Sequence, residues 1–325
     1  MSNRIVIAGG SGFLGRVLAE HFARAGREVV ILTRKPTKPD EILWDAATIG
    51  PWTRKLDGAE AVLNLTGRTV NCRYNAANRR EIMESRVKST RVIGEEIRRC
   101  AKPPRVWSNA STATIYKHTF GAPHDEGGDI GATAEACDAF SIEVAKAWER
   151  TLDEEVVPQT RKVALRAAMV LGMGENSVFP MLRRLARLGL GGRMGSGKQY
   201  VSWIHESDFC RAIDWILERD DFAGVVNIAA PNPVTNAEMM RLLREAVGAP
   251  FGLPAYEWML HIGAFVLRTE VELMIKSRRV VPKRLIESGF QFEFPTMQEA
   301  FAELTRRVPS EFPQPHRCEG QSLAR

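Results

Sequence analysis

A glycine-rich turn near the amino terminus constrains the fold of this chain more than any other feature of its sequence. The turn occupies residues 9–15, follows a short apolar run at residues 5–8 and precedes apolar residues at helical spacing. A strand, a glycine turn and a helix in this order open the βαβ unit of a dinucleotide-binding sheet. We therefore predict that a dinucleotide binds at this turn, through Gly9, Gly10, Ser11, Gly12, Phe13, Leu14 and Gly15.

The glycines of such a turn have separate physical roles. Gly9 permits a sharp change of direction, Gly12 lets the backbone approach a diphosphate, and Gly15 lets the helix pack closely on the strand. The free amides at the start of the helix then hold the diphosphate. A purely structural turn is the alternative, and it would not require this flanking context.

Apolar runs of strand length alternate with stretches of helical spacing in the first half of the chain. The runs are rich in branched residues and lie at 5–8, 29–32, 61–65, 106–109 and 163–171. Between them, apolar residues recur every three or four positions. This alternation predicts an α/β fold in which helices cover both faces of a parallel sheet, the doubly wound or Rossmann architecture.

The alternation changes after about residue 172, where an arginine-rich segment leads into a glycine-rich stretch. Prolines and polar residues dominate the last part of the chain, which is typical of a loose terminus. We expect a Rossmann domain at 1–172 with return segments from 200–235, a smaller C-terminal α/β domain at 173–308 that is mostly helical at its end, and a flexible tail at 309–325.

Composition argues against several classes of function. The net charge of +6 arises from 45 basic and 39 acidic residues that are interspersed, without the basic stripe of a nucleic-acid-binding protein. No stretch approaches the ~20 apolar residues of a membrane span, and no signal peptide precedes the first strand. The five cysteines are irregularly spaced, which indicates free thiols in a reducing compartment. We expect a cytoplasmic protein without a metal site that acts on a small molecule, and a homo-oligomer is compatible with the sequence.

The end of the second predicted strand favours one dinucleotide over the other. About 20 residues after the glycine turn, NAD-binding proteins usually carry an acid for the ribose 2′-hydroxyl, whereas an arginine accommodates a 2′-phosphate. Here the strand ends in Thr33, Arg34 and Lys35, and the planar guanidinium of Arg34 suits a phosphate. NADP(H) is therefore the expected cofactor, and a solvated basic turn is the alternative.

With these motifs the sequence resembles the extended, atypical short-chain dehydrogenase/reductases related to nucleotide-sugar epimerases. More narrowly, it resembles the NAD-dependent epimerase/dehydratase "epimerase family" proteins, some labelled cell-division inhibitors, which carry a C-terminal domain of unknown function. The resemblance extends to about Arg307. The stretches that carry it are 9–15, 32–34, 64–67, 85–86, 171–172, 195–197, 203–205, 230–235 and 281–284.

The resemblance implies a set of cofactor contacts beyond the glycine turn. Thr33 and Arg34 would contact the phosphate of the adenosine ribose, and further residues would line the same cleft. These further residues are Leu65, Thr66, Gly67, Glu81, Arg86 and Val170. Strand-end residues suit this role, because ligands of open parallel sheets lie beyond the carboxyl ends of the strands. For Arg86 the alternative is a solvated partner of a nearby acid on the same helix.

Catalysis is the point at which the chain departs from the resemblance. Working members of the superfamily use a serine or threonine to hold the substrate oxygen and a Tyr-x-x-x-Lys helix to transfer a proton. Thr112 stands at the hydroxyl position, but the predicted helix at 138–149 contains no tyrosine. The candidates to replace it are Tyr116, Ser141 and Lys146, each of which also suits a packed or solvated role.

Two hypotheses of different class therefore stand. The first is an NADP(H)-dependent oxidoreductase or epimerase that acts on a small carbonyl or hydroxyl compound, with Thr112 and Tyr116 as candidate catalytic residues. The second is a non-catalytic NADP(H)-binding sensor or interaction protein. A nucleoside-diphosphate sugar is not the expected substrate, because residues 201–203 lack the arginine that grips the diphosphate in the epimerases. His205 in the same segment is interpreted as a core histidine bonded to Asp208.

Overall fold

The computed structural model describes residues 3–256, 258–259 and 275–307, so the predicted tail at 309–325 lies outside the described residues. Its centre is a seven-stranded sheet in the order β10-β6-β5-β4-β1-β2-β3, in which every neighbouring pair is parallel. The predicted doubly wound fold is confirmed. The strands are β1 (Arg4–Ala8), β2 (Glu28–Thr33), β3 (Glu41–Leu43), β4 (Ala61–Asn64), β5 (Val106–Thr112), β6 (Arg161–Ala167) and β10 (Gly224–Ile228).

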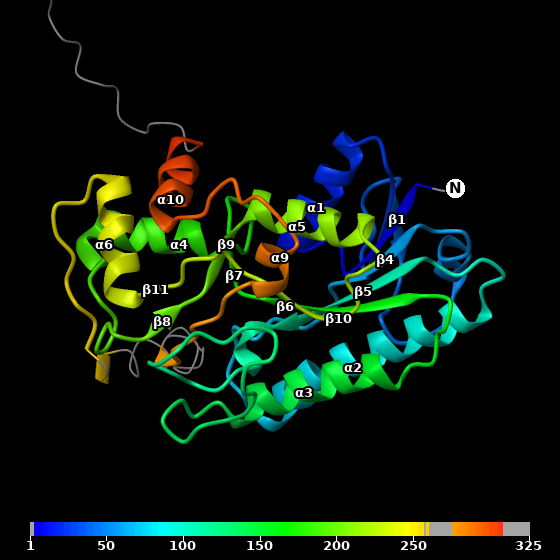
Figure 1. Cartoon of the computed structure of the whole chain (residues 1–325), viewed down its shortest axis with the longest axis horizontal. Coiled ribbons are helices and arrows are strands. Elements are labelled where there is room, and N and C mark those ends of the chain that lie inside the picture. Colours follow the sequence, from blue (N-terminus) through cyan, green and yellow to red (C-terminus); the bar gives the residue numbers. More distant parts are fainter. Residues whose placement is uncertain (1–2, 257, 260–274, 308–325) are drawn as a thin grey trace, which may run out of the picture.

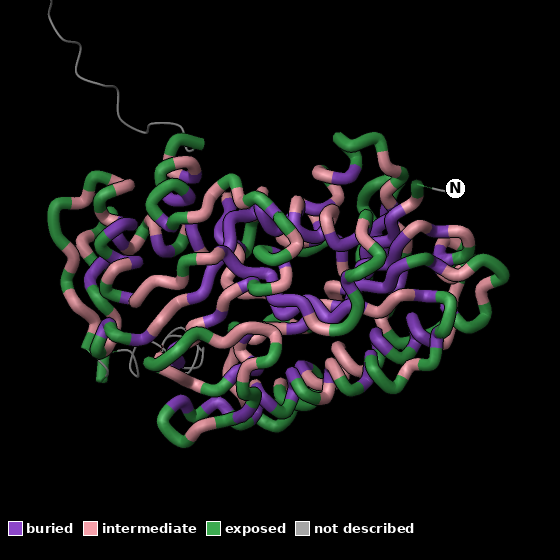
Figure 2. The backbone as a smooth tube through the Cα atoms, in the orientation of Figure 1, coloured by how far each residue is buried: buried purple, intermediate pink, exposed green. Residues whose placement is uncertain are grey.

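Helices cover both faces of this sheet (Figure 1). Helices α1 (Phe13–Arg24) and α5 (Glu206–Glu218) pack on one face, and α2 (Ala76–Arg99) and α3 (Ala139–Glu154) pack on the other. Alternate residues of each strand belong to the two faces: in β1, Ile5 and Ile7 lie in one core cluster and Val6 and Ala8 lie in the other. The buried strands between partly exposed helices are visible in Figure 2.

A smaller, mainly helical part lies beyond one end of the sheet, with α4 (Val178–Leu185), α6 (Asn236–Val247) and α10 (Met297–Arg306) around a core of its own (Figure 1). The chain enters it after β6 and returns to the large sheet through α5 and β10. None of the helices within the described ranges is long and apolar enough to cross a bilayer. The remaining elements are η1 (Pro51–Lys55), η2 (Ala113–Ile115), β7 (Met169–Leu171), α4 (Val178–Leu185), η3 (Ala186–Leu190), β8 (Tyr200–Val201), β9 (Trp203–His205), β11 (Val234–Thr235), α6 (Asn236–Val247), α9 (Lys283–Glu287) and α10 (Met297–Arg306).

The apolar run at 163–171 forms two strands rather than one. Ala168 donates its amide to Ile228 O in the large sheet, whereas the next residue, Met169, donates to Ser202 O. The chain therefore leaves the large sheet at Ala168, and β7 pairs with β9. This divergence opens the edge of the sheet along which the cleft described below is formed.

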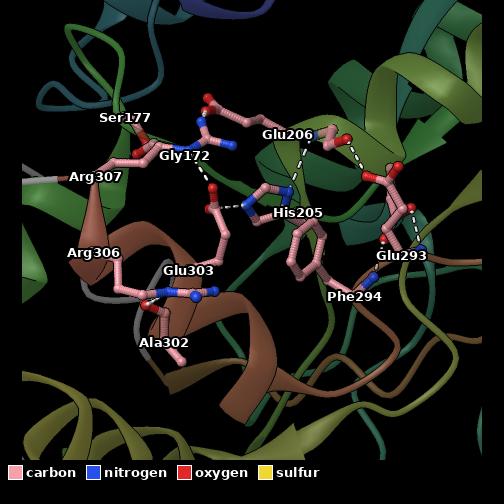
Figure 3. A network of polar contacts seen from close by, with 12 residues as sticks. Gly172, Ser177, His205, Glu206, Glu293, Phe294, Ala302, Glu303, Arg306 and Arg307 are labelled. Carbon is pink, nitrogen blue, oxygen red and sulfur yellow. Dashed lines mark hydrogen bonds and ion pairs between the residues drawn. The ribbon is translucent and has the colours of Figure 1, made fainter.

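His205 connects the two parts of the molecule (Figure 3). Its Nδ1 accepts the amide of Ser207 at 3.1 Å and caps α5, and its Nε2 lies 3.0 Å from Glu303 Oε2 on α10. Burial holds the pKa of His205 below its ordinary value, so Nε2 carries the single ring proton and donates it to Glu303. The prediction of a core histidine is correct, but its partner is Glu303, because Asp208 accepts the amides of Glu293 and Phe294.

A second contact joins the two halves of the chain near the start of α3. The ammonium of Lys276 is fully buried and contacts the carboxylate of Asp138, which precedes α3. It also donates to the carbonyl of Thr114 at 2.6 Å, and the neighbouring Ser277 donates its amide to His118 Nδ1 at 3.0 Å. The late segment is thereby fixed against the loop that follows β5.

Candidate functional site

A cleft of about 520 Å³ opens at the carboxyl ends of β1, β4 and β5. The strand order reverses between β1 and β4, so the cleft occupies the switch point at which open parallel sheets bind their ligands. The predicted site residues that line it are Gly9, Gly12, Phe13, Leu14, Gly15, Leu65, Arg86, Thr112 and Val170. The others, Gly10, Ser11, Thr33, Arg34, Thr66, Gly67, Glu81 and Tyr116, lie beside the cleft or away from it.

The turn between β1 and α1 has the geometry that its glycines predict. Gly9 has φ of +73° and donates its amide to Leu32 O at 2.9 Å, which ties the turn to β2. A Cβ at Gly15 would lie 2.3 Å from the Cα of Gly10, so α1 starts directly against the turn. The close approach of Gly15 is therefore to the backbone of Gly10, two residues beyond the end of β1, rather than to β1 itself.

Gly12 differs from its neighbours because the protein itself does not require a glycine there. The nearest atom to a Cβ at this position would be Gly9 O, at 3.8 Å, and the residue borders the cleft. Gly12 is also the N-cap of α1 and provides no side-chain cap, so the first amides of the helix are left for a ligand. In addition, the buried hydroxyl of Thr66, 3.1 Å from where a Gly9 Cβ would stand, has no partner in the described residues.

The end of β2 lies next to the glycine turn. The hydroxyl of Thr33 is buried and donates to Ser11 Oγ at 2.9 Å, which fixes the strand end against the turn. Arg34 follows on the surface, and its guanidinium makes no hydrogen bond or ion pair with any other described residue. A free guanidinium at this point can bind a phosphate without first breaking an internal contact.

Arg86 extends from α2 into the cleft. Its NH1 donates to the carbonyls of Arg68 at 3.2 Å and Ile82 at 2.9 Å, and its Cζ lies 4.9 Å from the ring centroid of Trp148. A Cβ at Gly67 would stand 3.0 Å from Cζ, so glycine at this position leaves room for the guanidinium. Burial lowers the pKa of Arg86 to about 10, which still leaves it a cation at neutral pH.

No carboxylate among the described residues pairs with Arg86. Glu81, predicted to line the cleft, is half exposed and forms an ion pair with Arg68 instead. Glu84 pairs with Lys88 at 2.9 Å on the outer face of α2. Both of these acids on α2 thus pair with other residues, and Arg86 faces the cleft without a carboxylate partner among the described residues.

Thr112 ends β5 at the edge of the cleft. Its Oγ1 accepts the amide of Thr114 at 3.1 Å, and no described residue accepts the hydroxyl hydrogen of Thr112. Tyr116 lies away from the cleft, with only 1% of its surface exposed. Its hydroxyl donates to Asn227 at 2.8 Å and accepts from Arg166 at 2.9 Å, and burial raises its pKa. This placement argues against Tyr116 as a proton donor.

The helix that normally carries the Tyr-x-x-x-Lys pair presents other residues here. Ser141 and Ala145, four positions apart and on one face of α3, line the cleft. They occupy the spacing of the tyrosine and lysine, but neither side chain can replace that pair as an acid and base. Lys146, the remaining candidate, is exposed and does not border the cleft.

Most of the remaining lining of the cleft is apolar, and sequence reasoning did not identify it. Phe140, Val144 and Trp148 share a face of α3, at the four-residue spacing that could have revealed them. Tyr74 and Val70, from the turn before α2, pack against the same cluster. Of all the residues that line the cleft, Tyr74 and Arg86 alone titrate. In the described ranges, no group of three acid, histidine or cysteine side chains could hold a metal ion.

Comparisons with known proteins agree with this geometry. The model of the NAD dependent epimerase/dehydratase family matches residues 5–229, and that of a domain of unknown function matches residues 257–304. The chain is 33% identical to the epimerase family protein SDR39U1 of Bos taurus, over 93% of this chain and 99% of that protein. It is 27% identical to the epimerase family protein YfhF of Bacillus subtilis, over 92% of this chain and 97% of that protein.

A solved structure extends the comparison to three dimensions. The crystal structure of human SDR39U1 (isoform 2) with NADPH matches with a TM-score of 0.82 and 29% identity, over 94% of this chain and 100% of that one. A nucleoside-diphosphate sugar epimerase from Corynebacterium glutamicum matches with a TM-score of 0.74 and 26% identity, over 94% of this chain and 58% of that one. These matches confirm the resemblance inferred from the motifs.

Proposed function

Because the chain belongs to the NAD dependent epimerase/dehydratase family, we propose that it is an NADP(H)-dependent oxidoreductase or epimerase acting on a small carbonyl or hydroxyl compound. The observation that carries the proposal is the cleft, in which the glycine turn and Thr112 border one continuous space. A cofactor held at the turn and a substrate oxygen held at Thr112 would therefore share that space.

The residues at the turn fit NADP(H). The open space at Gly12, the uncapped start of α1 and the partnerless hydroxyl of Thr66 suit a diphosphate. The free guanidinium of Arg34 suits a 2′-phosphate, and the human relative was crystallised with NADPH. When bound, the nicotinamide supplies or accepts hydride. Gly9, Gly10, Ser11, Phe13, Leu14, Gly15, Thr33, Leu65, Gly67 and Val170 would complete the cofactor site.

Thr112 would hold the substrate oxygen. Its hydroxyl has an internal donor, the amide of Thr114, but no internal acceptor, so its hydrogen is available to a carbonyl oxygen in the cleft. No histidine, lysine or carboxylate of the described residues lines the cleft, and the tyrosine of the usual pair is absent from α3. The proton for a nascent alkoxide would come from water, and we expect slow turnover compared with enzymes that retain that tyrosine.

The absence of that acid is also the observation that favours a second candidate function. With Ser141 and Ala145 on the catalytic face of α3, the chain could bind NADP(H) without turning over a substrate. Such a protein would act as a sensor of cofactor occupancy. The two candidates predict the same binding and different chemistry, so binding and turnover must be measured separately.

The test has two stages. Thermal denaturation with NADPH and with NADH measures binding, because a ligand that binds the native state raises the apparent stability. We expect a larger shift with NADPH, and no shift with either would refute the proposal. Oxidation of NADPH is then followed over a panel of carbonyl compounds. Thr112→Ala should abolish turnover and Thr112→Ser should retain it, whereas no turnover by the wild type on any compound would favour the sensor.

A further inference from the structure

Thr114 is a second threonine in the lining of the cleft, two residues after Thr112. Its amide donates to Thr112 Oγ1 at 3.1 Å, and its carbonyl accepts from the ammonium of Lys276 at 2.6 Å. Its hydroxyl oxygen accepts from Nε of Arg278 at 3.1 Å, and no described residue accepts its hydroxyl hydrogen. Because a hydroxyl has one hydrogen and Nε–H already faces the oxygen, this hydrogen is available to an acceptor in the cleft.

The contact between Arg278 and Thr114 differs from the contacts that fix the loop after β5. Residues 276–281 run along this loop, and several of their hydrogen bonds end on backbone carbonyls. Ser277 Oγ donates to Thr119 O, and Arg279 NH1 donates to Gly121 O. Arg278 instead places its Nε–H on a side chain that borders the cleft. The carbonyl contacts fix the path of the loop, whereas the contact of Arg278 acts on a hydroxyl.

A guanidinium that donates to a hydroxyl oxygen makes that hydroxyl a stronger donor. The hydrogen bond is charge-assisted, and hydrogen bonds in a chain polarise one another. Arg278 does not itself line the cleft, so its charge acts on a ligand through Thr114. A donor strengthened in this way favours an oxygen on which negative charge develops.

We propose that Thr112 and Thr114 together bind the oxygen of the substrate carbonyl as it becomes negatively charged, and that Arg278 is the positioning residue that orients and polarises Thr114. This inference rests on the proposed function and adds to it a second hydroxyl and a role for the C-terminal part of the chain. When hydride reaches the carbonyl carbon, the π electron pair moves to the oxygen. The resulting alkoxide accepts hydrogen bonds from both hydroxyls and then takes a proton from water. The pair thus stabilises the alkoxide although α3 lacks the tyrosine.

An oxyanion that binds without reacting tests the two hydroxyls independently of turnover. 4-Nitrophenol is titrated into the NADP⁺-loaded protein at a pH at which the phenol is partly ionised, and the phenolate absorption reports binding. Its methyl ether, 4-nitroanisole, is the neutral comparison and is followed by calorimetry. We expect Thr114→Val to lose about 10- to 100-fold in affinity for the phenolate and Thr114→Ser to retain it, with the affinity for the ether unchanged in both. No binding of the phenolate by the wild type would overturn the inference.

A double-mutant cycle tests whether Arg278 acts through Thr114. Arg278→Met should lose most of the phenolate affinity that Thr114→Val loses, and the double variant should lose no more than Thr114→Val alone. Arg279→Met is the matched control, because Arg279 holds the same loop and does not border the cleft, and it should bind as the wild type does. Losses in the double variant that equal the sum of the single losses would overturn the inference. Equal losses in Arg278→Met and Arg279→Met would overturn it too.

Thermal denaturation of each variant shows whether it is folded. If Arg278→Met does not fold, Arg278→Lys replaces it in the cycle. Lysine keeps the charge but lacks the fixed Nε–H, so Arg278→Lys should recover only part of the affinity. Wild-type affinity for the phenolate in a folded Thr114→Val variant would be sufficient to overturn the inference.

Reduction of phenanthrenequinone by NADPH provides a readout of the reaction itself. Thr114→Val should lower kcat roughly 100-fold and leave the KM for NADPH unchanged, because the alkoxide loses one of its donors. Turnover by the wild type with an unchanged kcat in Thr114→Val would overturn the inference and leave the proposed function standing. Binding of NADP⁺ and the phenolate without reduction of any carbonyl compound would support the anion site and refute the oxidoreductase.

Discussion

Two glycines of the turn, Gly12 and Gly15, have different surroundings and should respond differently to the same substitution. A Cβ at Gly15 would lie 2.3 Å from Gly10 Cα and 2.5 Å from Gly10 O. A Cβ at Gly12 would have its nearest protein neighbour at 3.8 Å and would project toward the cleft. We therefore expect Gly15→Ala to disturb the fold of the turn, and Gly12→Ala to affect ligand binding with little loss of stability.

The size of each effect follows from these distances. Carbon atoms in contact lie about 3.5–4.0 Å apart, so α1 must retreat from Gly10 by about 1 Å or more in Gly15→Ala. Overpacking of this kind costs about 1–3 kcal/mol, which corresponds to a fall in Tm of roughly 2–12 °C. Gly12→Ala loses less than about 1 kcal/mol, the advantage of glycine over alanine as an N-cap.

Thermal denaturation without ligand and fluorescence titration of NADPH measure the two effects. Gly12→Ala should weaken NADPH binding by more than about tenfold, because each lost hydrogen bond to a charged phosphate contributes about 1.5–3 kcal/mol. Gly15→Ala should lower both Tm and affinity. Gly127→Ala, in a surface loop without positive φ, is the control and should change neither. Wild-type affinity in Gly12→Ala, or an unchanged Tm in Gly15→Ala, would refute the reasoning.

Three further substitutions test other parts of the molecule. Arg34→Ala should weaken NADPH about 10- to 100-fold in a binding titration and leave NADH unchanged, because only the 2′-phosphate would lose its guanidinium; equal losses would contradict this role. Lys276→Met should lower the free energy of unfolding by about 3–5 kcal/mol in urea denaturation, since it leaves Asp138 buried and unpaired. His205→Asn should reduce the dependence of stability on pH. The folded-state pKa of His205 lies below its ordinary 6.5, so its contribution is complete above pH 6.5 and is lost as the pH falls through the lowered pKa. A Tm that falls with pH as steeply in the variant as in the wild type would exclude His205 as the cause.

The parts of the fold that the sequence predicts correctly are those set by neighbouring residues. The first strand, the glycine turn and α1 follow from one contiguous stretch, residues 4–24. The break at Ala168 has no local signal, because apolar residues continue through it from Ala167 to Leu171. It depends on Ile228 and Ser202, which bind the amides on either side of the break and are distant in sequence.

In the candidate site, too, some positions follow from neighbouring residues and others depend on residues that are distant in sequence. The positions of Gly9 and Thr112 follow from where their strands end, and the structure places both at the cleft. The surroundings of Arg86 could not be read from the sequence, because Glu81 is close enough on the helix to serve as its partner. Only the tertiary structure shows that Arg68, from the loop after β4, takes Glu81 and leaves Arg86 unpaired.

A cleft without a histidine, lysine or carboxylate among the described residues of its lining places particular demands on any chemistry within it. Thr112 can donate a hydrogen bond and Arg86 can bind an anion, but neither exchanges a proton at neutral pH. The rate enhancement must therefore come from orientation and from fixed positive charge beside an apolar wall, which excludes water and strengthens electrostatic contacts. Because no histidine, cysteine or carboxylate in the described part of the chain lines the cleft, turnover should be slow and nearly independent of pH near neutrality.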